Sequence, residues 1–163
     1  MGMVSLLTAS SLAPLLCTLF LTLTSATFSD DTPTAYEVLQ DYDFPVGIIP
    51  KGVTGYKLNK ETGEFSAYLS QTCKFPIESY ELEYKSTIRG VISKDKITNL
   101  QGVQVKVLFF WLNIVEVVRD GDELQFSVGL LSANFPIDNF FECPQCGCGL
   151  NCDKLRSSLV SYS

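Results

Sequence analysis

Apolar residues occupy alternate positions along most of the chain after Val53, a period that predicts β-strands with one buried and one solvated face. The alternation is clearest over residues 65–69, 79–92 and 124–130. Asp120-Gly121 and the segment NKETG at 59–63 are rich in turn-forming residues, so each predicts a hairpin between neighbouring strands. The pattern therefore predicts a largely antiparallel sheet.

A helical period precedes the strands, over residues 34–43 (TAYEVLQDYD). Its apolar side chains gather on one helical face: Tyr36, Leu39 and Tyr42, with Val38 beside them. Thr34 and Glu37 have the spacing of a capping box, and Pro45 ends the helix. We expect a short amphipathic helix that packs on the sheet.

The segment 103–118 (VQVKVLFFWLNIVEVV) is apolar on both faces when it is treated as a single strand. Its second apolar face provides the ligand-binding candidates: Leu108, Phe110, Leu112 and Ile114. Because a single sheet buries one face against its core, this patch needs a cover of its own. The N-terminal helix or a second sheet layer would cover it, as would a bound apolar ligand, a membrane surface or a partner chain. We expect so long a strand to bend, at Asn113, within a strongly curved sheet.

The N-terminus carries an unbroken apolar run, Leu12 to Leu23, followed by small residues up to Ala26. The run is shorter than the about 20 residues that a bilayer span requires, and it matches the apolar region of a signal peptide. We expect a signal peptide over residues 1–26, entry into the secretory pathway and an extracellular or cell-wall destination. The alternatives are the vacuole and attachment to a membrane through an uncleaved N-terminal segment. No transmembrane segment is expected after cleavage.

Cleavage would leave five cysteines, four of them in a Cys-rich tail at 143–163: Cys73, Cys143, Cys146, Cys148 and Cys152. In an oxidising compartment such a group predicts disulfides, with Cys73 joined to the tail and a second bridge within the tail. One thiol is left over, so the chain is expected to be a monomer or a disulfide-linked dimer. Zinc and a redox CxxC are the alternatives. The sulfurs crowd into ten residues with a single CxxC pair, so no metal site is expected.

The chain has 18 acidic and 12 basic residues, for a net charge of −6, which argues against a nucleic-acid partner. It contains no histidine, which excludes Ser-His-Asp and Cys-His nucleophiles. A Ser-Lys or carboxylate-pair mechanism is formally open, but no recognisable catalytic constellation is present. We therefore predict no catalytic residues and no cofactor, and expect that the protein is not an enzyme.

Three stretches resemble the plant "domain of unknown function 538" family: TAYEVLQDYDFPVGIIPKGVTGY, VKVLFFWLNIVEVVRDGDELQFSVG and FFECPQCGCG. The resemblance runs from about residue 34 to residue 152. It implies a mostly β domain with an N-terminal helix, similar to the lipid-binding half-barrel of bactericidal permeability-increasing protein. It also implies a small plant protein with a signal peptide, associated with stress responses. Proposals for the family include binding of lipopolysaccharide or other lipids and binding or hydrolysis of chlorophyll.

Pattern and resemblance together predict a mainly β (α+β) fold. We expect a strongly curved antiparallel sheet or half-barrel with a packed N-terminal helix, as one domain over 34–142 followed by the tail. The leading functional hypothesis is non-covalent binding of an apolar or amphipathic small molecule, a lipid or a pigment. The alternatives are a cell-surface structural or interaction module and a weak ester hydrolase acting on chlorophyll or lipid.

Overall fold

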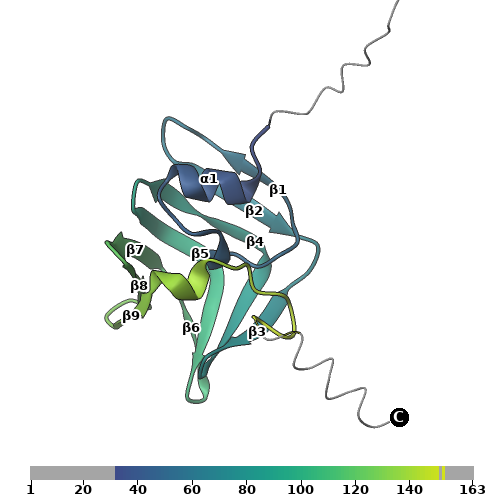
Figure 1. The fold of residues 1–163 in the computed structure, drawn as a ribbon, viewed down its shortest axis with the longest axis vertical. Coiled ribbons are helices and arrows are strands. Elements are labelled where there is room, and N and C mark those ends of the chain that lie inside the picture. The colour runs from purple at the N-terminus through teal and green to yellow at the C-terminus, as the bar shows by residue number, and fades with distance from the viewer. Residues whose placement is uncertain (1–31, 151, 153–163) are drawn as a thin grey trace, which may run out of the picture. The chain divides into compact units, whose positions relative to one another are not determined.

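An open antiparallel sheet is the main feature of the fold. The computed structural model describes residues 32–150 and residue 152, and within them nine strands form one sheet (Figure 1). Its strands are β1 (Val53–Leu58), β2 (Glu64–Leu69), β3 (Cys73–Ile77), β4 (Tyr80–Ser93), β5 (Lys96–Val107), β6 (Phe110–Asn113), β7 (Glu116–Asp120), β8 (Glu123–Ser127) and β9 (Ser132–Pro136). The predicted signal peptide, residues 1–26, lies outside the described residues. Residue 151 and the tail from residue 153 onward also lie outside them.

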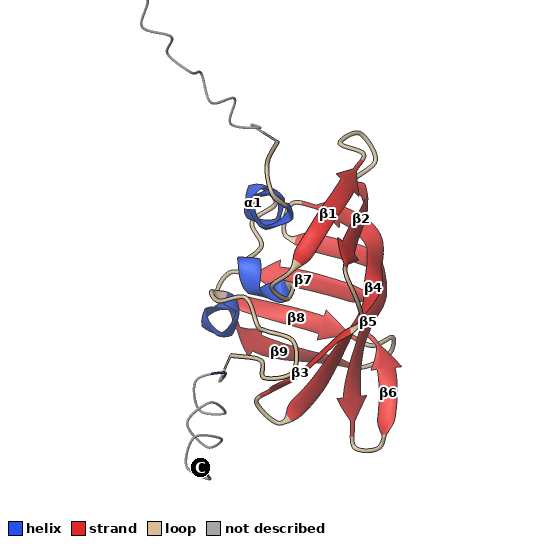
Figure 2. Ribbon diagram, turned by 90° about the vertical axis from the view of Figure 1, so that its right-hand side faces the viewer, coloured by secondary structure: helices blue, strands red, loops and turns tan. Residues whose placement is uncertain are grey.

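The two longest strands, β4 and β5, each pair with one strand along their first half and with another along their second half. The first half of β4 pairs with β3 and its second half with β2. The second half of β5 pairs with β6, whereas its start pairs with β7. The sheet therefore divides into two parts that share β4 and β5 (Figure 2). We call the part formed by β3, β6 and the adjoining halves of β4 and β5 the β3–β6 ribbon.

Irregular pairing between β4 and β5 coincides with this change of partners. Register shifts flank Arg89 on both sides. On β5, Asn99 and Gly102 adopt positive φ angles of 51° and 86°. A Cβ atom on Gly102 would collide with the carbonyl oxygen of Thr87, so the close approach of the two strands requires glycine. Such bulges bend both strands and curve the sheet.

The predicted helix is present as α1 (Ala35–Asp41). Thr34 Oγ1 accepts a hydrogen bond from the backbone N–H of Glu37, and the Glu37 carboxylate accepts one from the N–H of Thr34, which confirms the capping box. Two 3₁₀ segments, η1 (Val46–Ile48) and η2 (Ile137–Phe140), lie with α1 along one side of the sheet (Figure 2). Among the described residues, no helix is long and apolar enough to cross a membrane.

The core contains side chains of α1, η1 and the inner face of the sheet. Its most buried large apolar side chains come from four different segments: Phe44, Phe75, Ile88 and Leu124. The Tyr84 ring stacks on Phe75 with 5.6 Å between centroids, and its hydroxyl donates to the carbonyl oxygen of Ile48 at 2.7 Å. Burial raises the pKa of Tyr84, so this hydroxyl stays a donor.

Among the described residues, two disulfides hold the cysteine-rich segment. Cys73 of β3 is bonded to Cys146, and Cys148 is bonded to Cys152. The predicted arrangement, with one bridge from Cys73 to the tail and one within the tail, is confirmed. Cys143 keeps a free thiol that donates to the carbonyl of Val46, and burial raises the pKa of this thiol.

The prediction of one long strand over 103–118, bent at Asn113, is wrong. The segment contains the end of β5, a turn, β6 and the start of β7. Val107 pairs directly with Phe110, and Leu108 in the turn between them adopts a positive φ of 56°, so the chain reverses within two residues. The reversal brings residues of the two predicted apolar faces onto the same side of the sheet, because Val105 becomes the direct partner of Leu112.

Candidate functional site

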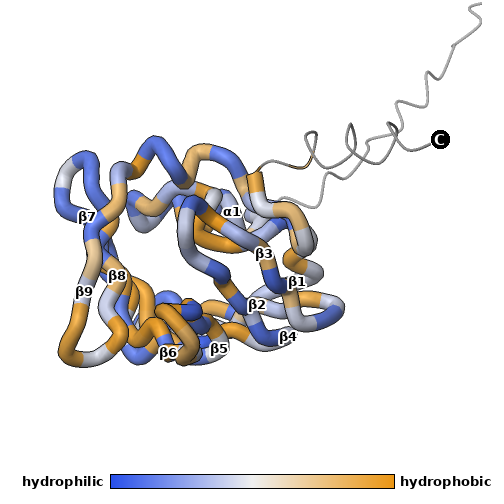
Figure 3. Tube along the Cα trace, turned by 90° about the horizontal axis from the view of Figure 1, so that it is seen from below, coloured by the Kyte–Doolittle hydropathy of each residue, from blue (hydrophilic) through white to orange (hydrophobic). Residues whose placement is uncertain are grey.

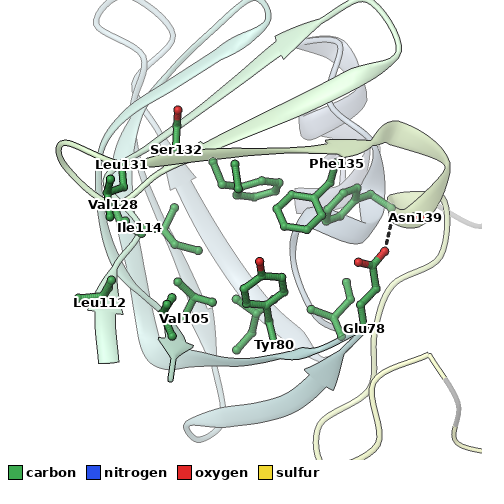
Figure 4. A pocket seen from close by; sticks show the side chains of 16 residues that line it. Glu78, Tyr80, Val105, Leu112, Ile114, Val128, Leu131, Ser132, Phe135 and Asn139 are labelled. Atoms are coloured by element: carbon green, nitrogen blue, oxygen red, sulfur yellow. Dashed lines mark hydrogen bonds between the residues drawn. The ribbon is translucent and has the colours of Figure 1, made fainter. Parts of the chain in front are cut away.

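A cavity of about 210 Å³ lies between the β3–β6 ribbon on one side and β8, β9 and η2 on the other. Sixteen residues line it (Figure 4). They come from four parts of the chain: Ile77, Glu78, Tyr80 and Leu82; Val105, Val107, Leu112 and Ile114; Phe126, Val128, Leu131, Ser132, Ala133 and Phe135; and Asn139 and Phe140. Only four of these side chains carry a polar atom, so the cavity wall is predominantly apolar.

The division of the sheet creates this cavity. β6 continues alongside β5, whereas β7, which follows it in the chain, pairs only with the start of β5. Between them, Ile114 still donates its N–H to the carbonyl of Val103, but the N–H of Val115 donates to Ser127 of β8. The chain therefore leaves the β3–β6 ribbon at this point and joins the β7–β9 part. The space that opens between the two parts is the cavity.

Aromatic side chains form the inner wall. Tyr80 of β4 meets Phe135 of β9 edge to face, with 5.8 Å between ring centroids. Phe135 contacts Phe126 at 5.8 Å in the same manner, and Phe126 packs on Phe140 of η2 at 5.4 Å. The cluster thus joins the two sides of the cavity. Rings held by several neighbours at these distances make a wall that is already formed before any ligand arrives.

The polar groups are few and unevenly placed. At one end, the Asn139 amide donates to the Glu78 carboxylate at 2.7 Å, joining the β3–β4 turn to η2 (Figure 4). The Tyr80 hydroxyl points into the middle of the cavity (Figure 4), and it has no hydrogen-bond partner among the described residues. The opposite end is bordered mostly by apolar side chains, including Leu112 and Leu131, with Ser132 next to Leu131. The cavity therefore has one end with a paired carboxylate and amide and an opposite end that is mostly apolar.

The structure separates the four predicted ligand-binding residues into two pairs. Leu112 and Ile114 line the cavity, and Ile114 is almost fully buried. Leu108 and Phe110 lie at the β5–β6 turn, where their side chains are 82% and 70% exposed. α1 does not cover this group of residues, because it packs on η1 and β1 instead.

Most of the lining residues were not among the sequence candidates. Alternation over residues 124–130 predicts an apolar strand face that contains Phe126 and Val128, but no local pattern indicates which apolar faces stay partly uncovered. The relevant signal is the second apolar face of 103–118, which contains Leu112 and Ile114, and the structure places both in the cavity wall. The partners across the cavity follow only from the pairing of the strands.

Two comparisons relate the chain to known proteins. The model of a family described as "Protein of unknown function, DUF538" matches residues 35–141. An uncharacterized protein of Arabidopsis thaliana is 28% identical over 95 residues, a match that covers 58% of this chain and 55% of the relative. The matched part thus spans about half of that relative's length. The family match includes every residue that lines the cavity.

Proposed function

The chain belongs to the DUF538 family of proteins of unknown function, and we propose that it binds an apolar or amphipathic small molecule non-covalently in the cavity described above. The observation that carries the proposal is the cavity wall: twelve of the sixteen lining side chains are wholly apolar, yet most of them are only half-buried. Leaving apolar surface open to water is unfavourable by about 25 cal/mol per Å², and a ligand would remove that cost.

The size and polarity of the cavity favour a lipid chain over a pigment. Pockets for drug-sized ligands measure about 300–1,000 Å³, whereas this cavity measures about 210 Å³. It has room for an acyl chain or a small ring system, but a chlorophyll macrocycle is too large to enter it whole. The Tyr80 hydroxyl and the Glu78–Asn139 pair would hydrogen-bond the ligand's polar group.

The curved, open sheet supports the resemblance to a lipid-binding half-barrel, which remains part of the proposal. The disulfides support the proposed secretory destination, extracellular or in the cell wall, since such bonds form and persist in oxidising compartments. Vacuolar delivery and attachment through an uncleaved N-terminal segment are the alternatives for localisation. The thiol of Cys143 is partly covered and has a raised pKa, so it supports a disulfide-linked interaction module less well than an exposed thiol would.

A titration with a fluorescent fatty acid tests the proposal. Ala133 lies on the open wall of the cavity, so Ala133→Phe adds a ring to free space instead of the packed core. Asn134→Phe is the matched control, because Asn134 follows Ala133 in β9 and its side chain therefore faces the other side of the sheet. We expect the fatty acid to bind the unaltered protein and Asn134→Phe, and to bind Ala133→Phe about tenfold more weakly. Equal binding by both variants, or none by the unaltered protein, would contradict the proposal.

A further inference from the structure

Two hairpin turns beside the cavity expose large apolar side chains to solvent. On the β5–β6 turn, Phe109 is 89% exposed and lies between two further exposed apolar residues, Leu108 and Phe110. On the β8–β9 turn, Leu130 is fully exposed and Leu131 is 68% exposed. Contiguous exposed apolar residues are uncommon on soluble domains and mark sites of interaction. We call these five residues the apolar turns.

The two turns belong to one region of the molecule, at the mouth of the cavity. Val107, which precedes the first turn, and Leu131, within the second, both line the cavity. Seen from below, both turns are strongly hydrophobic and follow one another along the same side of the domain (Figure 3). Figure 1 also shows them as neighbouring projections at its lower left. A flat apolar surface could therefore contact both turns together.

On the face that points away from the cavity, the β5–β6 hairpin becomes more polar with distance from its turn. Behind the apolar residues lies Trp111, which pairs across the hairpin with Lys106. Two strand positions further on, the Gln104 amide donates to Asn113 at 2.8 Å. The β8–β9 hairpin repeats this order, because Ser127 pairs with Ser132 behind the turn and the Gln125 amide then donates to Asn134 at 3.2 Å.

Trp111 has the surroundings of a residue at a membrane–water interface. The ammonium groups of Lys74 and Lys106 lie 5.0 and 5.8 Å from the centre of its ring. Each lysine is also paired with a carboxylate, Lys74 with Glu83 and Lys106 with Glu81. Tryptophan and lysine gather at the headgroup level of membrane proteins, because each has an apolar body and a polar end.

We propose that the apolar turns insert into the surface of a lipid bilayer made of electrically neutral lipids. At about 3.3 Å per residue, Trp111 lies roughly 7 Å behind Phe109, which agrees with the about 5–10 Å by which interfacial elements enter a membrane. The net charge of −6 disfavours a strongly anionic surface. This docking would point the mouth of the cavity at the lipid from which a ligand could enter. The proposed insertion depends on the apolar turns alone and is independent of whether the cavity binds a ligand.

Intrinsic fluorescence reports on this contact directly, because Trp111 is the only tryptophan of the chain. The protein is used as a secretory host processes and releases it, mixed with vesicles of pure phosphatidylcholine. We expect a blue shift of the emission, and stronger quenching by lipids brominated near the headgroup than by lipids brominated near the chain end. An uncleaved N-terminal segment that bound the vesicles by itself would not produce this depth profile at Trp111.

The double variant Phe109→Ser/Leu130→Ser removes one apolar side chain from each turn and leaves every cavity-lining residue in place. We expect its partition onto the vesicles to fall about tenfold or more, because both removed side chains would be buried among the lipids. Phe141→Ser is the control, since Phe141 is 59% exposed but lies outside both turns. Binding of the fluorescent fatty acid should be unchanged in both variants, which separates a failure of docking from a failure of cavity binding.

Three results would overturn the proposal. The first is an unchanged Trp111 emission with phosphatidylcholine vesicles, including the case in which only anionic vesicles shift it. The second is undiminished partition of the double variant. The third is a dimer that the unaltered protein forms in the absence of vesicles and the double variant does not form, because the turns would then pair with a second copy of the chain.

Discussion

Val105 and Leu112 are direct partners in the β5–β6 hairpin, and both side chains line the cavity. Leu112 is only half-buried, so a charge at this position can reach water in the empty protein but would be buried under a bound apolar ligand. We predict that Leu112→Asp folds and binds the fluorescent fatty acid at least about tenfold more weakly. Asn113→Asp adds the same charge on the opposite face of β6 and should bind normally. Equal loss in both variants would point to overall charge instead of the cavity.

The close approach of β4 and β5 at Gly102 is expected to be necessary for the curvature of the sheet. Gly102→Ala must place a methyl group against the carbonyl of Thr87 at a positive φ, so we predict a loss of about 2–4 kcal/mol in the free energy of unfolding. Gly121→Ala is the control, because Gly121 also has a positive φ but has open space around it. It should lose only about 1 kcal/mol. Urea unfolding of both variants measures the difference, and similar losses would contradict the proposed contact.

The disulfide from Cys73 to Cys146 should stabilise the fold more than the one from Cys148 to Cys152, because it closes a longer loop. The two bridges span 73 and 4 residues in the sequence. Loop-closure entropy gives about 4 kcal/mol for the first and about 2 kcal/mol for the second. We therefore predict the larger drop in unfolding free energy for Cys73→Ala/Cys146→Ala. If the Cys148→Ala/Cys152→Ala variant lost as much, the pairing would be in doubt, and peptide mapping without reductant would decide it.

The buried hydroxyl of Tyr84 makes stability depend on alkaline pH. Tyr84→Phe leaves the Ile48 carbonyl without its partner and should cost about 1–2 kcal/mol at neutral pH. The pKa of Tyr84 is raised from 10.0 in the folded chain, so above pH 10 the unfolded chain releases this proton while the folded chain retains it. The unfolded state then binds fewer protons, and stability falls as pH rises. We predict that the advantage of the unaltered protein over Tyr84→Phe shrinks above pH 10. A difference that stayed constant up to pH 11.5 or so would contradict the assignment.

Local features of the fold could be predicted from the sequence. The capping box of Thr34 and Glu37 depends on residues three positions apart, and it is present. The hairpin expected at Asp120-Gly121 is also present, with Asp120 pairing across the turn with Glu123. In both cases, the residues that determine the structure lie within one turn of the chain, so their chemistry is sufficient.

The β5–β6 hairpin could not be predicted in this way. Its turn contains Leu108 and Phe109, with no Gly, Asn, Asp or Pro to indicate a reversal. Leucine seldom adopts a positive φ, and the pairing of Val105 with Leu112 outweighs this preference. The cavity depends on the same non-local pairing. The alternation over residues 79–92 also predicts a solvated face for the polar positions, but Glu83, one of them, is only 5% exposed because Lys74 and Lys85 cover and neutralise it.

Native mass spectrometry tests the central claim, ligand binding in the cavity, most directly. The protein is released gently from the tissue that produces it, beside the Ala133→Phe variant made in the same tissue. We predict an added mass of roughly a few hundred daltons, as expected for a small-molecule ligand. This added mass should disappear on denaturation and be absent or much reduced in the variant. A protein that carries no added mass, and gains none when incubated with a fatty acid, would contradict the claim.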